Sequence, residues 1–389
     1  MSVVRRQNLD VILLMAVLFL LLFGVCFVFT ASSARAEHLH QDSAFYLKRQ
    51  MLRMLAGLLL GYLMMRVDYH KILQISPLIY MASLAMLVFL LFAPESWTIR
   101  GSRRWLMLGP VQFQPSELAK YSLVYYLAMN FAKPNLDLRK LGDGLMPQLL
   151  LIGATVIVVA LEPDLGSALM ITAVALCLLF LAGAKLAHLF ALLSTAALAL
   201  LAFSAKVAYQ RGRVESFVES FLGNAEPAWQ VKQSLIGLGS GGLTGLGLGN
   251  SKQKLMFLPD PFTDFIMSII GEELGLLGAL TVIVLFLLIL WRGFNIARHA
   301  ADQEGRLAAW GITCAIGLGA FINMAVVMNL LPTTGIPLPF VSYGGTALIM
   351  NLIGVGILLN ISRSGKAVTA KGMSQVPLAK VQWYRDRKR

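Results

Sequence analysis

The stretch LPDPFTDFIMSIIGEELG, residues 258–275, opens a long apolar run that continues to about residue 291. A run of that length is typical of a membrane span. It nevertheless carries Asp264, Glu272 and Glu273 inside or beside its apolar residues. A carboxylate near the centre of a bilayer costs roughly 2.5 kcal/mol or more. These three acids therefore need an explanation, either in chemistry or in structure.

The whole chain has the composition of a membrane protein. Of its 389 residues, 57% are hydrophobic and only 14% are charged, whereas about a quarter are charged in a soluble globular protein. We therefore predict an all-α, polytopic integral membrane protein. Its ten expected transmembrane helices lie at residues 9–31, 50–65, 72–93, 116–132, 146–161, 165–183, 186–206, 265–291, 307–331 and 345–361.

The distribution of lysine and arginine predicts the orientation. We expect one transmembrane domain over residues 1–365, a basic cytoplasmic tail over 366–389, and a large extracytoplasmic loop, 207–263, between the seventh and eighth helices. With both termini cytoplasmic, the tails and inner loops hold 19 of the 33 basic residues, as the positive-inside trend requires. The net charge of +13 is then explained by topology and contact with anionic membrane lipids, and we expect no nucleic-acid partner.

Basic residues also occur on the predicted outer side, in RGSRRWLMLGPVQFQPSELAK (residues 100–120). Three arginines there oppose the positive-inside trend: Arg100, Arg103 and Arg104. Trp105 suits the membrane interface. Pro115 favours a helix start, so Glu117 and Lys120 lie one turn apart on the same face. A snorkelling lysine paired with a glutamate accounts for those two alone, but it leaves the arginines unexplained, so we predict a functional site.

A glycine-rich segment lies within the expected outer loop. In QSLIGLGSGGLTGLGLGNSKQK (233–254), seven glycines fall between residues 237 and 249. Gly237, Gly239 and Gly242 match a dinucleotide fingerprint in spacing, but no strand precedes them, which argues against nucleotide binding. We instead predict a mobile segment, partly re-entrant, that closes over a substrate.

The apolar run that starts near residue 265 begins at the outer face, so Asp264 lies at the start of its helix. Glu272 is about 80° and Glu273 about 180° around that helix from Asp264, so the three acids do not form one cluster. An alternative to chemistry for Asp264 is a helix-dipole partner. For the two glutamates the alternative is bonding to neighbouring helices or to Arg53.

A last polar segment, LLPTTGIPLPFVSYGGT (330–346), holds three prolines and three glycines. Such a stiff, broken helix start can donate backbone N–H groups to an anion. The fourth, sixth, eighth and tenth predicted helices all begin on the outer side, beside Arg103, Arg104 and Lys120. This arrangement favours a polyanion, and a nearby carboxylate suits a proton acceptor. We therefore predict phosphate-bearing lipid chemistry at the outer leaflet.

At these residues the sequence resembles the SEDS family (shape, elongation, division and sporulation), and within it the FtsW cell-division branch. The matching segments run in family order: FYLKRQ (45–50), GSRRWL and FQPSELAK within 101–120, EPDLGSALM (162–170), and the segments 233–254, 258–275 and 330–346. The resemblance implies a peptidoglycan glycosyltransferase in the bacterial cytoplasmic membrane. It implies polymerisation of lipid II into β-1,4 glycan strands at the outer face of that membrane, at the division septum.

The resemblance also implies site residues. Asp264 matches the essential aspartate of the family and is the predicted catalytic residue. Arg103, Arg104, Glu117 and Lys120 match polar-cavity positions, and we add three further substrate-binding candidates to them: Trp105, Ser342 and Tyr343. Phe262 stands where the family usually has histidine, which argues against an imidazole role here.

The implied partners are undecaprenyl-pyrophosphate-linked glycan, a class B penicillin-binding protein that crosslinks the strands, and other divisome membrane proteins. A divalent cation, Mg²⁺ or Mn²⁺, could bridge pyrophosphate and a carboxylate, although no compact ligand motif indicates one. Three alternatives remain open: a lipid II flippase, a scaffold that recruits division proteins, and the same polymerase chemistry in elongation, as in the RodA branch.

Overall fold

The computed structural model describes residues 9–98, 102–109, 111–206 and 208–364. Arg100 and the predicted tail, 366–389, lie outside these ranges. The described α-helices are α1 (Val11–His40), α2 (Phe45–Arg66), α3 (Tyr69–Leu91), α4 (Pro115–Phe131), α5 (Met146–Leu161), α6 (Leu165–Leu181), α7 (Leu186–Lys206), α8 (Ala208–Phe221), α9 (Trp229–Ser240), α10 (Ile266–Arg298), α11 (Gln303–Val327) and α12 (Gly345–Ser364).

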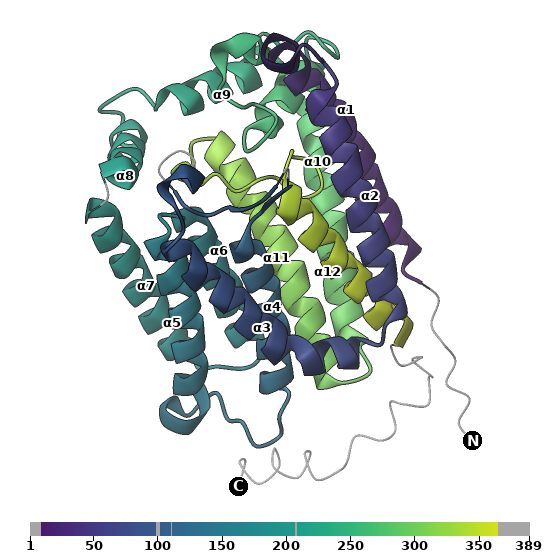
Figure 1. The fold of residues 1–389 in the computed structure, drawn as a ribbon, viewed down its shortest axis with the longest axis vertical. Coiled ribbons are helices and arrows are strands. Elements are labelled where there is room, and N and C mark those ends of the chain that lie inside the picture. Colours follow the sequence, from purple (N-terminus) through teal and green to yellow (C-terminus); the bar gives the residue numbers. More distant parts are fainter. Residues whose placement is uncertain (1–8, 99–101, 110, 207, 365–389) are drawn as a thin grey trace, which may run out of the picture.

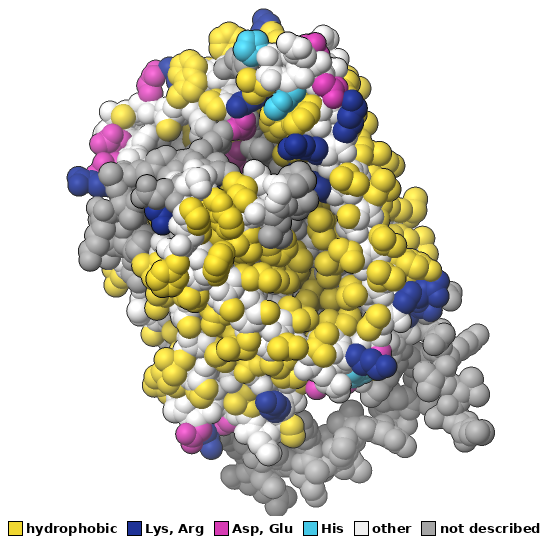
Figure 2. Space-filling view, viewed as in Figure 1, with side chains coloured by type: hydrophobic (Ala, Val, Ile, Leu, Met, Phe, Trp, Pro, Cys, Tyr) yellow, Lys and Arg dark blue, Asp and Glu magenta, His cyan; other side chains and the backbone are white. Residues whose placement is uncertain are grey.

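Each predicted span overlaps one helix, α1 to α7 and α10 to α12, although α1 and α10 extend well beyond their predicted ends at residues 31 and 291. Six helical segments of the described chain are long and apolar enough to cross a membrane: α1, α3, residues 141–161, α10, α11 and α12. Helix α6 and residues 186–196 of α7 are shorter apolar helices. Figure 2 shows hydrophobic side chains over the middle of one face and charged side chains toward its two ends. The protein is therefore an all-α polytopic membrane protein, as predicted.

The bundle has two distinct ends (Figure 1). Helix α1 begins and α12 finishes at one end, called the terminal end here. Helices α8 and α9 and the segment before α10 lie at the opposite end, the loop end. Along the bundle α2 packs closely on α12, because a Cβ on Gly356 would lie only 2.1 Å from the Gly61 carbonyl oxygen. Small residues at such crossings let transmembrane helices approach.

The expected outer loop, 207–263, contains more structure than the sequence indicated. It holds α8, α9 and a short π-helical turn, η3 (Gln253–Phe257). A second unpredicted element is a hairpin after Trp105, in which β1 (Leu106–Leu108) pairs antiparallel with β2 (Val111–Phe113). Two further short turns are η1 (Glu95–Trp97) and η2 (Leu141–Leu145). The hairpin and the helices of the outer loop cover the loop end of the bundle.

The glycine-rich segment has a packing role that the predicted mobility did not include. A Cβ on Gly241 would lie 1.9 Å from the Gly271 carbonyl oxygen, and one on Gly245 would lie 2.2 Å from that of Glu273. Real Cβ contacts are never so short, so only glycine lets this segment reach α10. Backbone contact with α10 is the physical reason for these two glycines.

Helix α10 is interrupted where this segment meets it. Gly275 adopts φ 64° and ψ −160°, which is not helical. The N–H groups of Leu246 and Gly247 donate to the carbonyls of Glu272 and Glu273 at 2.9 and 3.0 Å. On the other side of the break, two α10 amides, Leu276 and Leu277, donate to the carbonyls of Gly242 and Leu243. The predicted span is thus two helices. At the break between them, α10 exchanges backbone hydrogen bonds with residues 242–247, and we call this set of bonds the backbone exchange.

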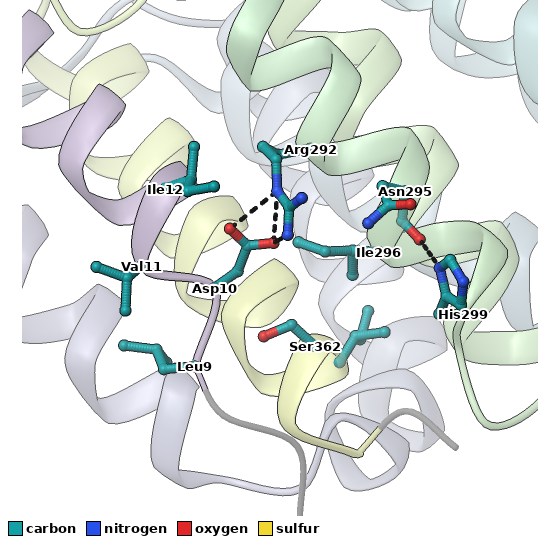
Figure 3. Close-up of a pocket in the computed structure, with 10 residues that line it drawn as sticks. Leu9, Asp10, Val11, Ile12, Arg292, Asn295, Ile296, His299 and Ser362 are labelled. Carbon is teal, nitrogen blue, oxygen red and sulfur yellow. Dashed lines mark hydrogen bonds and ion pairs between the residues drawn. The ribbon is translucent and has the colours of Figure 1, made fainter. Parts of the chain in front are cut away.

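At the terminal end, Asp10 caps α1 and binds Arg292 of α10 (Figure 3). Arg292 Nε and Nη2 lie 3.0 and 2.6 Å from Asp10 Oδ2. A cavity of about 270 Å³ beside this pair is lined by residues from the ends of α1, α10 and α12. Its lining contains none of the predicted site residues, so it has no part in the candidate site.

We expect Gly275→Ala to destabilise the protein strongly. The added Cβ would lie 2.4 Å from the Gly245 nitrogen, at a positive φ that alanine rarely adopts. The combined clash and strain should cost on the order of 2 kcal/mol or more. Thermal unfolding of the purified protein in detergent, followed by intrinsic fluorescence, measures this loss.

The matched control for that change is Gly153→Ala. Gly153 lies in α5 with no heavy atom within 4 Å of an added Cβ, so this variant should unfold near the wild-type temperature. Equal unfolding temperatures for the two variants would show that the backbone exchange at Gly275 does not stabilise the fold.

Candidate active site

Four helix starts converge at the loop end. The Gln114 N–H, just before α4, donates to Thr346 Oγ1 in α12 at 2.9 Å. Gln114 Nε2 donates to Asp164 Oδ2, just before α6, at 3.1 Å. The Tyr343 N–H, before α12, donates to the Phe262 carbonyl, before α10, at 2.9 Å. The four helices that we expected to begin on one side therefore bring their positive dipole ends to one place.

Asp264 lies within this convergence, two residues before α10. It follows a tight turn in which the Thr263 N–H donates to the Asp260 carbonyl at 3.1 Å. The Thr263 hydroxyl lies 2.8 Å from that same carbonyl oxygen and 2.8 Å from Asp264 Oδ1. Among the described residues, no lysine or arginine pairs with Asp264 and its Oδ2 has no hydrogen-bond partner. This half-buried carboxylate is therefore placed to accept a proton.

Asn323 of α11 holds the Asp264 backbone, and it was not among the residues predicted from sequence. Its amide nitrogen donates to the Asp264 carbonyl at 2.7 Å and to the Ile336 carbonyl at 2.9 Å. Only 1% of Asn323 is exposed. One side chain thus joins the segments before α10 and α12 to the centre of the bundle. The available signal was an amide in the last turns of an apolar helix, where polar groups usually bond across helices.

An aromatic cluster fixes the same two segments against α2. The Tyr46 ring lies 4.6 Å from that of Phe262 and 5.4 Å from that of Tyr343, centroid to centroid. The guanidinium of Arg53 lies 4.7 Å from the Tyr343 centroid. Phe262 therefore has a packing role at the position beside Thr263 and Asp264. Arg53 belongs to this cluster, which corrects its predicted alternative role as a partner of Glu272 or Glu273.

The two glutamates of α10 have a structural role. Glu272 accepts the N–H groups of Lys252 and Gln253 at 3.0 and 3.3 Å, and also the Ser251 hydroxyl. Glu273 accepts the Ser251 N–H at 3.4 Å and the Lys254 ammonium at 3.3 Å. Both glutamates are fully shielded from solvent. They hold the segment before Asp264 in place. The role is structural, but the partners are residues 251–254 and not the neighbouring helices or Arg53 that the structural alternative named.

The predicted arginines differ in their surroundings. Arg104 Nη1 lies 3.5 Å from Asp164 Oδ1, and a Cβ on Gly335 would lie 3.8 Å from the same nitrogen. Arg104 therefore lies beside Gly335. The next residue, Ile336, has the carbonyl that accepts the second hydrogen bond from Asn323. Arg103 instead donates to Thr98 Oγ1 and to the Ala93 carbonyl, each at 3.3 Å. Arg103 therefore anchors its own loop.

The three other predicted substrate-binding residues lie before β1 and before α12. Trp105 is half-buried immediately before β1. Ser342 is buried, where its hydroxyl accepts the Leu338 N–H at 2.9 Å and its carbonyl accepts Gln50 Nε2 at 3.2 Å. Tyr343 contributes its ring to the aromatic cluster. In this structure Ser342 and Tyr343 shape the segment before α12.

Glu117 and Lys120 form the predicted pair inside α4. Lys120 Nζ lies 2.7 Å from Glu117 Oε2, and the side chains of Lys120 and Glu117 are only 8% and 10% exposed. Among the described residues, neither is hydrogen bonded to Asp264. Breaking one partner of a buried pair leaves the other charge uncompensated. The Glu117 carboxylate is therefore held in an ion pair with Lys120. The Asp264 carboxylate has no such cationic partner among the described residues and is the better candidate for a base.

The acidic turn between α5 and α6 carries less charge than its sequence indicates. Glu162 is 1% exposed, and neither of its carboxyl oxygens has a hydrogen-bond partner among the described residues. Burial, followed by the charge of Asp164, raises the pKa of Glu162 to about 9. Asp164 instead accepts the Ser167 N–H and hydroxyl. Near neutral pH, Glu162 is therefore protonated.

Comparison with known proteins identifies relatives along nearly the whole chain. The family model for the FtsW/RodA/SpoVE cell cycle proteins matches residues 11–367. A probable peptidoglycan glycosyltransferase FtsW from Geobacter sp. (strain M18) is 39% identical over 92% of this chain and 98% of its own. Stage V sporulation protein E from Bacillus subtilis (strain 168) is 35% identical, also over 92% and 98%.

Two solved structures share the fold. The crystal structure of the rod shape determining protein RodA from Thermus thermophilus has a TM-score of 0.68 at 26% identity, covering 92% of this chain and 98% of that one. A chain from a peptidoglycan synthase complex, described as coordinating polymerization and crosslinking, has a TM-score of 0.74 at 29% identity with the same two coverages.

We expect Glu162→Gln to stabilise the protein, and more so at pH 8 than at pH 5. The folded state keeps the Glu162 proton up to about pH 9, whereas the ordinary pKa is 4.5. Rising pH across this interval therefore favours the unfolded state, which releases the proton. Glutamine removes that penalty, on the order of a few kcal/mol at high pH. Unfolding temperatures of both proteins at the two pH values measure it, and a constant difference would contradict it.

Proposed function

The chain belongs to the FtsW/RodA/SpoVE family of cell cycle proteins, and we propose from this membership and the site geometry that it is a peptidoglycan glycosyltransferase of the FtsW type. It polymerises lipid II into β-1,4 glycan strands at the outer face of the cytoplasmic membrane during cell division. The observation that carries the proposal is Asp264: a half-buried carboxylate, one of whose oxygens has no hydrogen-bond partner among the described residues, where four positive helix ends meet.

The proposed reaction is a single inverting displacement. The GlcNAc 4-hydroxyl of lipid II attacks the anomeric carbon of the MurNAc at the end of a growing strand. The bond from that carbon to undecaprenyl pyrophosphate breaks, and the α link becomes β, so no enzyme nucleophile is needed. Asp264 accepts the hydroxyl proton, and general-base help of this kind is typically worth about 10²- to 10⁴-fold.

The leaving pyrophosphate needs positive charge and N–H donors. Arg104 supplies charge and N–H donors, and the starts of α4, α6 and α12 add positive dipole ends at one place. We assign Arg103 and Lys120 to the same anion, with Glu117 positioning Lys120 through their 2.7 Å pair. Trp105, Ser342 and Tyr343 are proposed substrate contacts around it.

A metal is not required by this scheme. Within the ranges that the structure describes, no group of three or more His, Cys, Asp and Glu residues is arranged to hold a metal ion. Mg²⁺ needs few protein ligands when a substrate supplies phosphate oxygens. A Mg²⁺ or Mn²⁺ ion that arrives with pyrophosphate would therefore be held chiefly by the substrate.

We also propose the partner and the orientation. The likeness to a chain of a synthase complex that polymerises and crosslinks supports a class B penicillin-binding protein as partner, alongside other divisome membrane proteins. With the loop end outside, both termini are cytoplasmic and the site meets lipid II in the outer leaflet. We propose placement at the division septum, which the relatives named FtsW support.

The alternatives have less support. A lipid II flippase needs polar groups along a route through the bundle, whereas the candidate residues gather at the loop end. A scaffold would not need an available carboxylate among positive helix ends. An elongation role shares the fold, as the RodA likeness illustrates, but relatives named FtsW favour division.

We expect Asp264→Asn and Asp264→Ala to abolish polymerisation, by about 10²-fold or more, because the base is lost. The assay gives purified protein labelled lipid II, with and without a cognate class B penicillin-binding protein, and resolves long glycan on a gel. Asp42→Asn is the matched control, since Asp42 is another acid at the loop end whose partner is the exposed Lys48.

The other outcomes separate the hypotheses. Polymer from a folded Asp264→Asn protein would keep the enzyme but remove Asp264 as base, leaving Glu117 as the next candidate. If the wild type made no polymer under either partner condition, transport of labelled lipid II between vesicle leaflets would be the decisive assay.

We expect Asn323→Leu to lower the polymerisation rate by about tenfold or more with little change in the KM for lipid II, because Asp264 loses its backbone anchor. Asn295→Leu, at the far end of α10, is the control and should keep the wild-type rate. Steady-state kinetics on both variants measure the effect. A rise in KM alone would show that Asn323 serves substrate binding and not the placement of Asp264.

A further inference from the structure

Helix α1 is longer than a membrane requires. Its 30 residues extend about 45 Å at 1.5 Å per residue, against about 30 Å of hydrocarbon. The surplus emerges at the loop end and terminates cleanly at Gln41, which adopts φ 53° and donates its N–H to the Glu37 carbonyl at 3.0 Å. This extension carries Arg35 beyond the apolar core.

Arg35 reaches the turn that leads to Asp264. Its Nη1 lies 2.7 Å from Asp260 Oδ1, with side chains only 27% and 13% exposed. Partial burial makes such a pair stronger than a solvated one. The Nε of Arg35 is buried without a hydrogen-bond partner. The guanidinium is therefore held at Asp260 at some cost in solvation.

Asp260 connects Arg35 to the proposed base, Asp264, through the turn that follows it. It adopts φ 48°, a left-handed conformation that aspartate tolerates better than most residues. Its carbonyl accepts the N–H of Thr263, whose hydroxyl lies 2.8 Å from both that carbonyl and Asp264 Oδ1. An unbroken series of polar contacts thus runs from α1 through the turn to Asp264.

A second contact supports the turn from the same hairpin of helices. The ring of His40, at the end of α1, stacks on Phe45, at the start of α2, with centroids 3.7 Å apart. Tyr46 then packs on Phe262 inside the turn at 4.6 Å. The α1–α2 hairpin therefore contacts the turn at a charged residue and at an aromatic residue.

We propose that Arg35 is a positioning residue for glycosyl transfer: through its ion pair with Asp260 it fixes the 260–263 turn and so aims the Asp264 carboxylate. This inference rests on the proposed function. In this proposal, the loop end of α1 controls the position of Asp264. Among the described residues, no ion pair or hydrogen bond joins α1 directly to Asp264.

The test uses Arg35→Gln, Asp260→Asn and the double variant in the full-length protein, assayed with labelled lipid II. Each single change should lower kcat about ten- to hundredfold, as small misplacements of a reacting group do, and leave KM within about twofold. The double variant should be no slower than the slower single one, because both changes remove the same pair. Arg35→Lys should recover most of the rate.

Lys48→Gln is the matched control. It removes an exposed pair with Asp42 at the same end, 2.8 Å long, and should keep the wild-type kcat. Three results would overturn the proposal. They are kcat losses that multiply in the double variant, an Arg35→Lys protein as slow as Arg35→Gln, and a change in KM alone.

Hydrogen–deuterium exchange measures the mobility of the turn independently of glycosyl transfer. Residues 258–265 should exchange faster in Arg35→Gln than in wild type or Lys48→Gln, at an unchanged unfolding temperature. Unchanged exchange would overturn the inference even with an active wild type. If the wild type made no polymer, the proposed function would fail, and the exchange result would still decide whether Arg35 holds the turn.

Discussion

A membrane protein that breaks its helices must satisfy each freed backbone group within itself. Here this constraint shapes the whole loop end. The break at Gly275 is closed by amides and carbonyls of residues 242–247. The irregular segments before α10 and α12 bond to each other through Phe262 and Tyr343. The helices therefore start together, and their positive dipole ends point to one site.

The same constraint separates the acids by role. Glu272 and Glu273 accept bonds from the segment that leads to the site, and Glu117 is paired with Lys120. Glu162 is protonated near neutral pH because burial raises its pKa. Asp264 differs, since its backbone is anchored by Asn323 while one carboxylate oxygen has no partner in the part of the chain that the structure describes. Anchoring the backbone and leaving the oxygen available suits a general base.

Local patterns predicted what depends on neighbours in sequence. Apolar runs gave the ten helices, the i, i+3 spacing gave the Glu117–Lys120 pair, and the start of an apolar run placed Asp264 at a helix start. Contacts between residues far apart in the chain could not be predicted from these local patterns. Asn323 bonds a carbonyl 59 residues away, and Glu272 bonds residues about 20 positions earlier. The packing role of the glycines was missed because a sequence does not reveal which backbone will approach them.

The central claim is that Asp264 faces the reacting hydroxyl while Arg104 and the helix starts hold pyrophosphate. A structure of the Asp264→Asn protein with lipid II and a strand-like donor bound tests it most directly. We expect the acceptor 4-hydroxyl within about 3.2 Å of the residue 264 side chain, and pyrophosphate beside Arg104 and the start of α12. An acceptor hydroxyl at Glu117, or pyrophosphate bound away from the loop end, would contradict it.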